Sequence, residues 1–283
     1  MYSTTTIMKN PKLSGKHMGT HQQLDKAARQ VLARPLGDWY FPTTHEIIYF
    51  EGMRGPDGLK RKSPNADDPS HMLVGGDRQL IDQIFDHYHN LVQALRQHND
   101  VRAAFEAAWM AHKITDALTP AHHFPLDEAK ETLMSNKEFI KIFGEPIKGI
   151  MHGHNMLETA RNNWLYWGAG GYMSKHVAYE YGVAIIVAAL PQKAILPRVG
   201  RSEFRRVNPQ QTLDKAIAKI QAADMYTRFC RDGWTTDLAL DTKNLLLPEI
   251  IRTLALIWYA AAFEAHGSRK NRSSHIASSM NPA

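Results

Sequence analysis

Apolar residues recur at intervals of three and four along most of this 283-residue chain. That spacing is typical of amphipathic helices, which turn one apolar face towards a core. Alternation of apolar and polar residues, the mark of a half-buried strand, is scarce. We therefore predict an all-α protein, a compact multi-helix bundle, with helices over residues 21–33, 43–53, 76–100, 101–118, 127–144, 146–167, 174–190, 212–232 and 247–267.

The apolar fraction of 43% is enough for a sizeable core, so we expect one domain over residues 19–267. The polar, aperiodic segment 1–18 is predicted to be a flexible arm, and the polar segment 268–283 a disordered tail. Residues 55–71 contain three prolines and three aspartates, which favours a loop. The glycine-rich stretch 168–171 interrupts the helices. No strand precedes it and no GK[ST] follows, so it is not a phosphate-binding loop.

No continuous apolar run of a secretory signal stands at the N-terminus, so we expect a cytoplasmic protein. The longest apolar stretch, 245–263, contains Pro248, Glu249 and Arg252. We predict that it is a buried core helix rather than a membrane span.

The net charge of +6 fits an anionic partner such as a phosphate ester, a nucleic acid or a lipid surface, although a solvated basic surface explains it equally well. The single cysteine, Cys230, excludes a disulfide framework and a thiolate metal cluster. Any metal must therefore be held by His, Asp and Glu, which favours zinc, manganese or iron. Fifteen histidines provide an ample supply of nitrogen ligands.

The segment 111–123, AHKITDALTPAHH, has the spacing H-x-x-x-D-x-x-x-P-x-H, formed by His112, Asp116, Pro120 and His122. Residues four apart lie on one face of a helix, so His112 and Asp116 project together. His154 and Glu158 repeat this spacing in the predicted helix 146–167. Two such pairs on facing helices can form a metal site in a bundle core. The alternative is a solvated polar helix end.

These motifs resemble the zinc-dependent phospholipase C and single-strand nuclease superfamily, an all-α fold with three zinc ions. The resemblance extends over roughly residues 19–160. The family has a histidine at the start of its first helix, matched by His21 in GTHQQLDKAA. It then has a loop aspartate and a loop histidine, matched by Asp57 in FEGMRGPD and by His71, fourteen residues later.

The resemblance implies three zinc sites in a cleft between helices. One would be formed by Asp57, His71, His112 and Asp116, a second by His122, His154 and Glu158, and a third by His21 and a bridging Asp116. Two features depart from the family. Secreted relatives complete the third site with an N-terminal tryptophan, whereas about twenty residues precede His21 here. The interval from His122 to His154 is also longer than in the bacterial phospholipases.

Several other residues compete for these roles. His45 is an alternative to His21, but it stands only twelve residues before Asp57, too few for the family arrangement. Asp67 and Asp68 are alternatives to Asp57, three or four residues before His71. His123 and His152 are close to predicted ligands and are assigned no role. His87, His89, His98 and His176 are interpreted as surface histidines or histidines with satisfied hydrogen bonds.

The function implied by the resemblance is hydrolysis of a phosphodiester, in a phospholipase C-like reaction. A metal-activated hydroxide would attack phosphorus in line, and Asp57 would orient or deprotonate the attacking water. The cofactor would be two or three zinc ions, with iron or manganese as alternatives. The substrate would be an anionic phosphoester, either a phospholipid or a nucleotide, and a peripheral membrane contact would fit the basic charge. No protein partner can be inferred.

Three features bear on this choice. The absence of a disulfide pair and of a signal separates the chain from the secreted nucleases. Gly58 stands where the bacterial lipase has a choline-contacting aromatic residue, so a preference for phosphatidylcholine is not implied. Other hypotheses remain open: a single-strand nuclease or nucleotidase, a di-iron or manganese oxidative enzyme, and a non-catalytic helical protein with structural metals.

Overall fold

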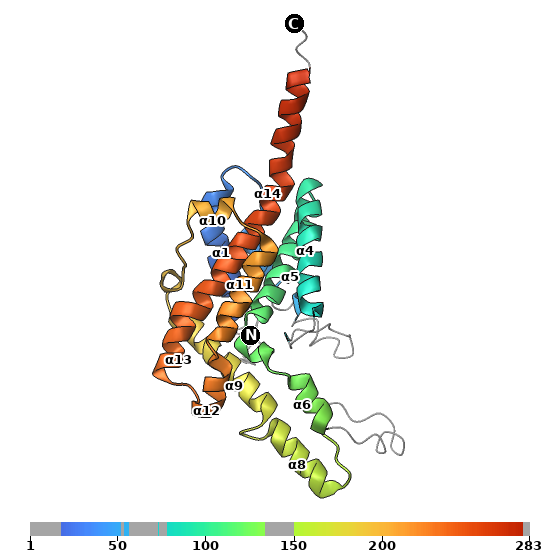
Figure 1. Ribbon diagram of the computed structural model, residues 1–283, viewed down its shortest axis with the longest axis vertical. Helices are drawn as coiled ribbons and strands as arrows, with labels where there is room; N and C mark the ends of the chain where they lie inside the picture. The colour runs from blue at the N-terminus through green and yellow to red at the C-terminus, as the bar shows by residue number, and fades with distance from the viewer. Residues whose placement is uncertain (1–17, 52–53, 57–72, 74–77, 134–149, 280–283) are drawn as a thin grey trace, which may run out of the picture.

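A computed structural model describes residues 18–51, 54–56, 73, 78–133 and 150–279 (Figure 1). Every regular element within these residues is a helix, so the prediction of an all-α fold is confirmed. One hydrophobic core joins buried residues from Leu24 to Ala265. The part that carries the candidate site consists of α1 (Thr20–Leu36), α2 (Thr44–Tyr49), α4 (Gln79–Arg96), α5 (Asp100–Ala117), the 3-10 turn η2 (Pro120–His123) and α9 (Tyr172–Ala189).

The centre of the core is α14 (Leu247–Ser279), which packs against α1, α4, α5 and α11 (Pro209–Ala222). Its segment from Leu254 to Ala262 is buried on all sides, and the Trp258 indole donates a hydrogen bond to the Ala107 carbonyl at 3.2 Å. Residues Thr236–Gly267 are long and apolar enough to cross a membrane, but 83% of the apolar window is buried inside the protein. Such burial is typical of the core helix of a soluble protein, as predicted for residues 245–263.

Beyond its first turn, helix α5 is buried or half-buried between its neighbours. Its alanines at positions 103, 104, 107, 108 and 111 are all buried, and their small side chains allow close packing against α4 and α14. Asn99 caps its first turn by accepting a hydrogen bond from the Arg102 backbone amide at 3.1 Å. The helix ends at Ala117, and Pro120 begins η2 three residues later. This sharp turn directs His122 back towards the end of α5.

Helices α6 (Leu126–Leu133) and α8 (Met156–Trp167), together with the first turns of α9, extend from the lower end of the bundle in Figure 1. The C-terminal end of α14 projects at the opposite end. The remaining short elements are η3 (Gln192–Ala194), α10 (Arg201–Arg205), α12 (Met225–Asp232), α13 (Thr236–Asp241) and the π-turn η4 (Thr242–Leu246).

The structure differs from the predicted helices at three places. The predicted helix 212–232 is divided into α11 and α12 at Asp224, whose backbone is left-handed with φ of 46°. The predicted helix 146–167 begins only at Met156, behind the cap residue Asn155. Helix α14 continues to Ser279, where we predicted a disordered tail from 268 onwards. No proline interrupts residues 268–279, so the helix has no breaker there. Residues 1–17 of the predicted arm 1–18, and residues 280–283, lie outside the described residues.

Candidate metal centre

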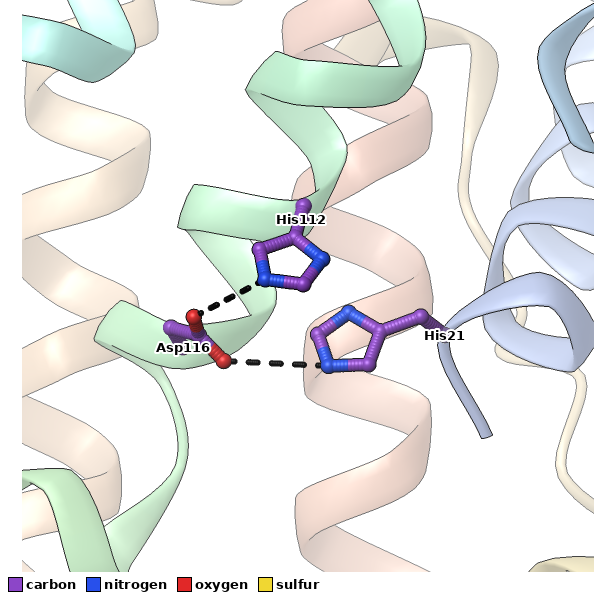
Figure 2. A group of neighbouring side chains, drawn as sticks. All are labelled: His21, His112 and Asp116. Atoms are coloured by element: carbon purple, nitrogen blue, oxygen red, sulfur yellow. Dashed lines mark ion pairs between the residues drawn. The ribbon is translucent and has the colours of Figure 1, made fainter. Parts of the chain in front are cut away.

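The first group of candidate ligands brings α1 and α5 together. His21 lies in the first turn of α1, and His112 and Asp116 lie one turn apart on α5 (Figure 2). His21 Nε2 is 3.7 Å from Asp116 Oδ1, and His112 Nε2 is 3.3 Å from Asp116 Oδ2. All three side chains are buried, and their ligand atoms lie close enough to one another to hold one metal ion.

These separations are compatible with ligands around one metal ion. Two ligands at 2.0–2.1 Å from a tetrahedral zinc lie about 3.3 Å apart. Hydrogen bonds between nitrogen and oxygen are shorter, about 2.7–3.2 Å. The distances from Asp116 to His112 and His21 are both longer than this range. The ligand atoms of the three side chains are therefore spaced closely enough to hold one ion.

His21 provides the clearest sign that the group needs a ligand. Its side chain is only 1% exposed, yet neither ring nitrogen has a hydrogen-bond partner among the described residues. A buried polar atom without a partner is costly, and a metal ion would satisfy one nitrogen. Burial and the neighbouring His112 lower the pKa of His21 from 6.5 to about 4. The ring is consequently neutral at pH 7, which is the form that binds a metal.

The second group joins η2 to α9. His122 Nε2 lies 2.8 Å from Glu180 Oε1, and His176 Nε2 lies 3.4 Å from the same oxygen. The rings of His122 and His176 are stacked with centroids 5.1 Å apart. The pKa of Glu180 lies well below its usual range: burial opposes its ionisation, and hydrogen bonds from His122 and His176 are among the causes that favour it. This group is again buried and able to hold one metal ion.

Asp116 connects the two groups. Its Oδ1 lies 3.7 Å from His122 Nδ1, the same distance that separates it from His21 Nε2. Burial opposes ionisation of Asp116, but His112 and His122 outweigh it and lower the pKa of Asp116 well below its usual range. The carboxylate is therefore ionised at neutral pH and lies between two sets of histidines. Ions held by the two groups would be neighbours.

Two further buried carboxyl groups support the first group. Glu51 Oε1 lies 3.0 Å from His112 Nδ1, which leaves the other ring nitrogen of His112 to face Asp116. Such a carboxylate–histidine contact fixes the orientation of a metal ligand. Asp25 lies one turn after His21 on α1 and is 1% exposed. Burial and the nearby Glu51 raise the pKa of Asp25 well above its usual value, so its carboxyl group is held protonated.

Of the predicted ligands, His21, His112 and Asp116 come together as one group, and His122 lies beside them. Asp57 and His71 lie outside the described residues. His45, the rejected alternative to His21, is exposed on α2, and His123 is occupied by the Ala117 carbonyl at 2.8 Å.

The pairing of His122 with His154 and Glu158 is corrected by the structure. His154 precedes α8 and is exposed, so it is not one helical turn from Glu158. The Glu158 carboxylate instead accepts a hydrogen bond from the His154 backbone amide at 2.8 Å, at the start of the helix. His176 and Glu180 lie beside His122 in their place.

The sequence did contain a signal for the pair that lies beside His122. His176 and Glu180 have the same H-x-x-x-E spacing as His154 and Glu158. They lie in a helix that is otherwise mostly apolar, where a buried histidine and carboxylate must find partners. Asp25 repeats the pattern in α1, four residues after His21. His176 is therefore not a surface histidine: it is buried and contacts Glu180, and its use as a metal ligand is a proposal.

No family model, curated protein or solved structure matches this chain. The resemblance drawn from the motifs stays a prediction, and the functional argument depends on the site itself. That site consists of two adjacent buried groups of His, Asp and Glu residues that could hold metal ions.

Proposed function

We propose that this protein is a metal-dependent phosphodiester hydrolase, phospholipase C-like, with two neighbouring zinc ions. The observation that carries the proposal is the position of Asp116: its Oδ1 faces both His21 and His122, and its Oδ2 faces His112. A carboxylate shared by two histidine-rich groups is suited to hold two cations close together. Paired cations of this kind are characteristic of enzymes that cleave phosphate esters.

In this proposal His21, His112 and Asp116 hold one ion, and His122, His176 and Glu180 hold the other. Bound zinc supplies Lewis acidity towards phosphoryl oxygens and water. The neutral imidazoles bind without adding charge, and the ionised Asp116 and Glu180 offset part of the charge of the cations. Glu51 keeps His112 in the orientation that faces Asp116. The roles of Asp57 in orienting water and of His71 as a ligand remain part of the proposal on the strength of the resemblance.

The test combines metal analysis with three assays run side by side. Purified protein is loaded with zinc and given phosphatidylcholine, a soluble bis-aryl phosphodiester, or single-stranded DNA. We expect hydrolysis of at least one substrate that stops with chelator and returns with zinc. His176→Ala is expected to abolish it, whereas the matched variant His154→Ala retains it. Bound metal without hydrolysis of any of the three substrates would refute the hydrolase.

A structural metal site is the second candidate, because all six ligand side chains are only 1–7% exposed. Structural zinc is closed by four protein ligands, whereas catalytic zinc keeps a position open. Replacing zinc by cobalt distinguishes the two. Added inorganic phosphate would change the visible spectrum of an open site and leave that of a closed site unaltered. Recovery of iron rather than zinc from protein purified without added metal would favour the oxidative enzyme instead.

A further inference from the structure

A cavity of about 420 Å³ lies between the C-terminal end of α1 and the short helix α10, at the upper end of the bundle in Figure 1. Its volume is within the range of small-molecule sites, about 300–1,000 Å³. Three arginines line it: Arg34 from α1, and Arg201 and Arg205 from α10. The rest of the lining is apolar or aromatic: Val31, Pro35, Val199, Phe204 and Tyr259. These eight residues are called the arginine pocket below.

The lining is arranged as an apolar base with a charged rim. The apolar and aromatic residues of the arginine pocket are buried or half-buried, whereas its three arginines are exposed. The rings of Phe204 and Tyr259 meet edge to face at the base, with centroids 5.0 Å apart. A ligand in this cavity would therefore have an apolar surface beneath it and guanidinium groups around it.

The positive charge of the arginine pocket is not compensated by the protein. Within the described part of the chain, its three guanidinium groups form no hydrogen bond and no ion pair. No carboxylate lines the cavity. Glu203, on α10 itself, is held elsewhere: it accepts hydrogen bonds from the Gly200 backbone amide at 2.9 Å and from the Arg252 guanidinium. Three cations without a counter-charge around one cavity attract an anion.

Tyr259 supplies a hydrogen-bond donor at the base of the cavity. Its side chain is only 8% exposed, and its hydroxyl has no hydrogen-bond partner among the residues that the structure describes. Burial raises the pKa of Tyr259, and the neighbouring Arg205 opposes this rise without cancelling it. The hydroxyl is therefore protonated at neutral pH. A largely buried hydroxyl without a partner is costly, and an anion in the cavity would accept its hydrogen bond.

The arginine pocket is separate from the candidate metal centre. His21 and Arg34 are thirteen residues apart on the same helix, α1, which corresponds to about 20 Å along its axis. One small ligand cannot contact both places. Binding at the arginine pocket is therefore a property distinct from the proposed hydrolysis, and it requires no metal.

The number of donors and the apolar base indicate the class of anion. A phosphate monoester has three terminal oxygens and a charge near −2, which suits several guanidinium groups better than a carboxylate does. The aromatic base favours a ligand with a flat apolar part. We propose that the arginine pocket binds a small organic phosphate, a phosphate monoester with a flat apolar group. Its phosphate would contact the arginines and the Tyr259 hydroxyl, and its apolar group would lie on the base.

The test is calorimetric titration of the full-length protein after its metal has been removed by chelator and dialysis. The probes are phenyl phosphate, adenosine monophosphate and inorganic phosphate. We expect phenyl phosphate or adenosine monophosphate to bind about tenfold more tightly than inorganic phosphate, because the apolar group is buried on the base. The tighter of the two esters identifies whether an aryl phosphate or a nucleotide fits better. Binding should weaken as salt is raised.

The matched variants are Arg205→Gln and Arg206→Gln, neighbours at the end of the same helix. Arg205 lines the arginine pocket, whereas Arg206 lines an adjoining cavity that contains the Glu203 carboxylate. Arg205→Gln should weaken binding about tenfold or more, because it removes a charge-assisted hydrogen bond. Arg206→Gln should bind like the wild type. Circular dichroism and thermal melting establish that both variants are folded.

Two further measurements locate the ligand. Tyr259→Phe keeps the ring but removes the hydroxyl, and it should weaken binding by about fivefold. The bound ester should protect Arg201 and Arg205, but not Arg206, from modification by phenylglyoxal, as read by mass spectrometry.

Three results would overturn the binding: no binding of either ester, equal weakening in Arg206→Gln, or inorganic phosphate bound as tightly as the esters. Equal weakening would mean diffuse attraction to a basic surface. Failure of this binding is distinguishable from failure of the hydrolase. A zinc-loaded protein that cleaves a phosphodiester, but in metal-free form binds no monoester, contradicts only the arginine pocket. A protein that binds the monoester but cleaves nothing contradicts only the hydrolase.

Discussion

Replacing Asp116 by Asn is the most informative single change. The substitution keeps the shape of the side chain but removes the charge that faces ligand atoms of both groups, at 3.3 Å and 3.7 Å. Binding of zinc to a four-ligand protein site is worth roughly 10–16 kcal/mol, so one ligand contributes about 3 kcal/mol. That corresponds to about a hundredfold in the dissociation constant. We expect this loss at the ion held by His21, His112 and Asp116, and a smaller loss at the second ion, because Asp116 faces its ligand His122.

The assay is competition with a chromophoric chelator, followed by elemental analysis of dialysed protein. The matched control is Asp25→Asn, another buried aspartate on a helix of the same centre. The raised pKa of Asp25 keeps its carboxyl group protonated, so an amide is a close substitute and both ions should be retained. The reasoning is refuted if Asp116→Asn retains both ions at unchanged affinity, or if Asp25→Asn loses as much metal as Asp116→Asn.

Three further predictions follow from the same geometry. By elemental analysis, His176→Ala should lose about one equivalent of metal, whereas His154→Ala should retain the full complement. Loss of metal from His154→Ala but not from His176→Ala would instead favour the pairing of His122 with His154 and Glu158. Free zinc at about a thousand times its dissociation constant should raise the free energy of unfolding by about 4 kcal/mol per ion, and identical urea curves with and without chelator would contradict this. The metal-free protein should lose stability as pH falls from 6.5 to about 4, because the unfolded chain takes up the His21 proton first. The loss is about 3 kcal/mol, and His21→Gln should remove that part of the pH dependence; an unchanged slope would count against it.

The helical fold and four of the six residues of the candidate centre were predictable, mostly because their signals are local. His112, Asp116 and His122 lie within eleven residues, and their relative positions follow from one helical turn and a proline. His21 was identified through its place at the start of the first helix. The core position of α14 was predictable from its apolar composition despite Glu249 and Arg252.

The residues beside His122 differ from the predicted ones, because they are brought to His122 by long-range packing. Two H-x-x-x-E patterns follow His122, and spacing alone cannot decide between them. The decisive residue is Asn155, which accepts a hydrogen bond from the Glu158 amide at 2.9 Å and begins α8 after His154. Asparagine is among the preferred N-cap residues, so the sequence did indicate a helix start at Asn155. The helical spacing of residues 146–167 favoured an earlier start instead.

The orientation of α8 was also beyond sequence periodicity. The segment MLETARNNWLYW has helical spacing, but spacing alone does not show which face of the helix is buried. The buried face is held by backbone groups at Leu133, Met151 and Gly153, which hydrogen-bond to the helix, and by Tyr166, which packs against Leu126 and Met151.

Anomalous diffraction at the zinc edge, from crystals of the zinc-loaded protein, tests the central claim most directly. We predict two neighbouring peaks with ligand distances of about 2.0–2.2 Å. One should be coordinated by His21, His112 and Asp116, and the other by His122, His176 and Glu180. An absence of peaks in this centre, or a peak at His154 and Glu158 instead, would contradict the two-ion centre.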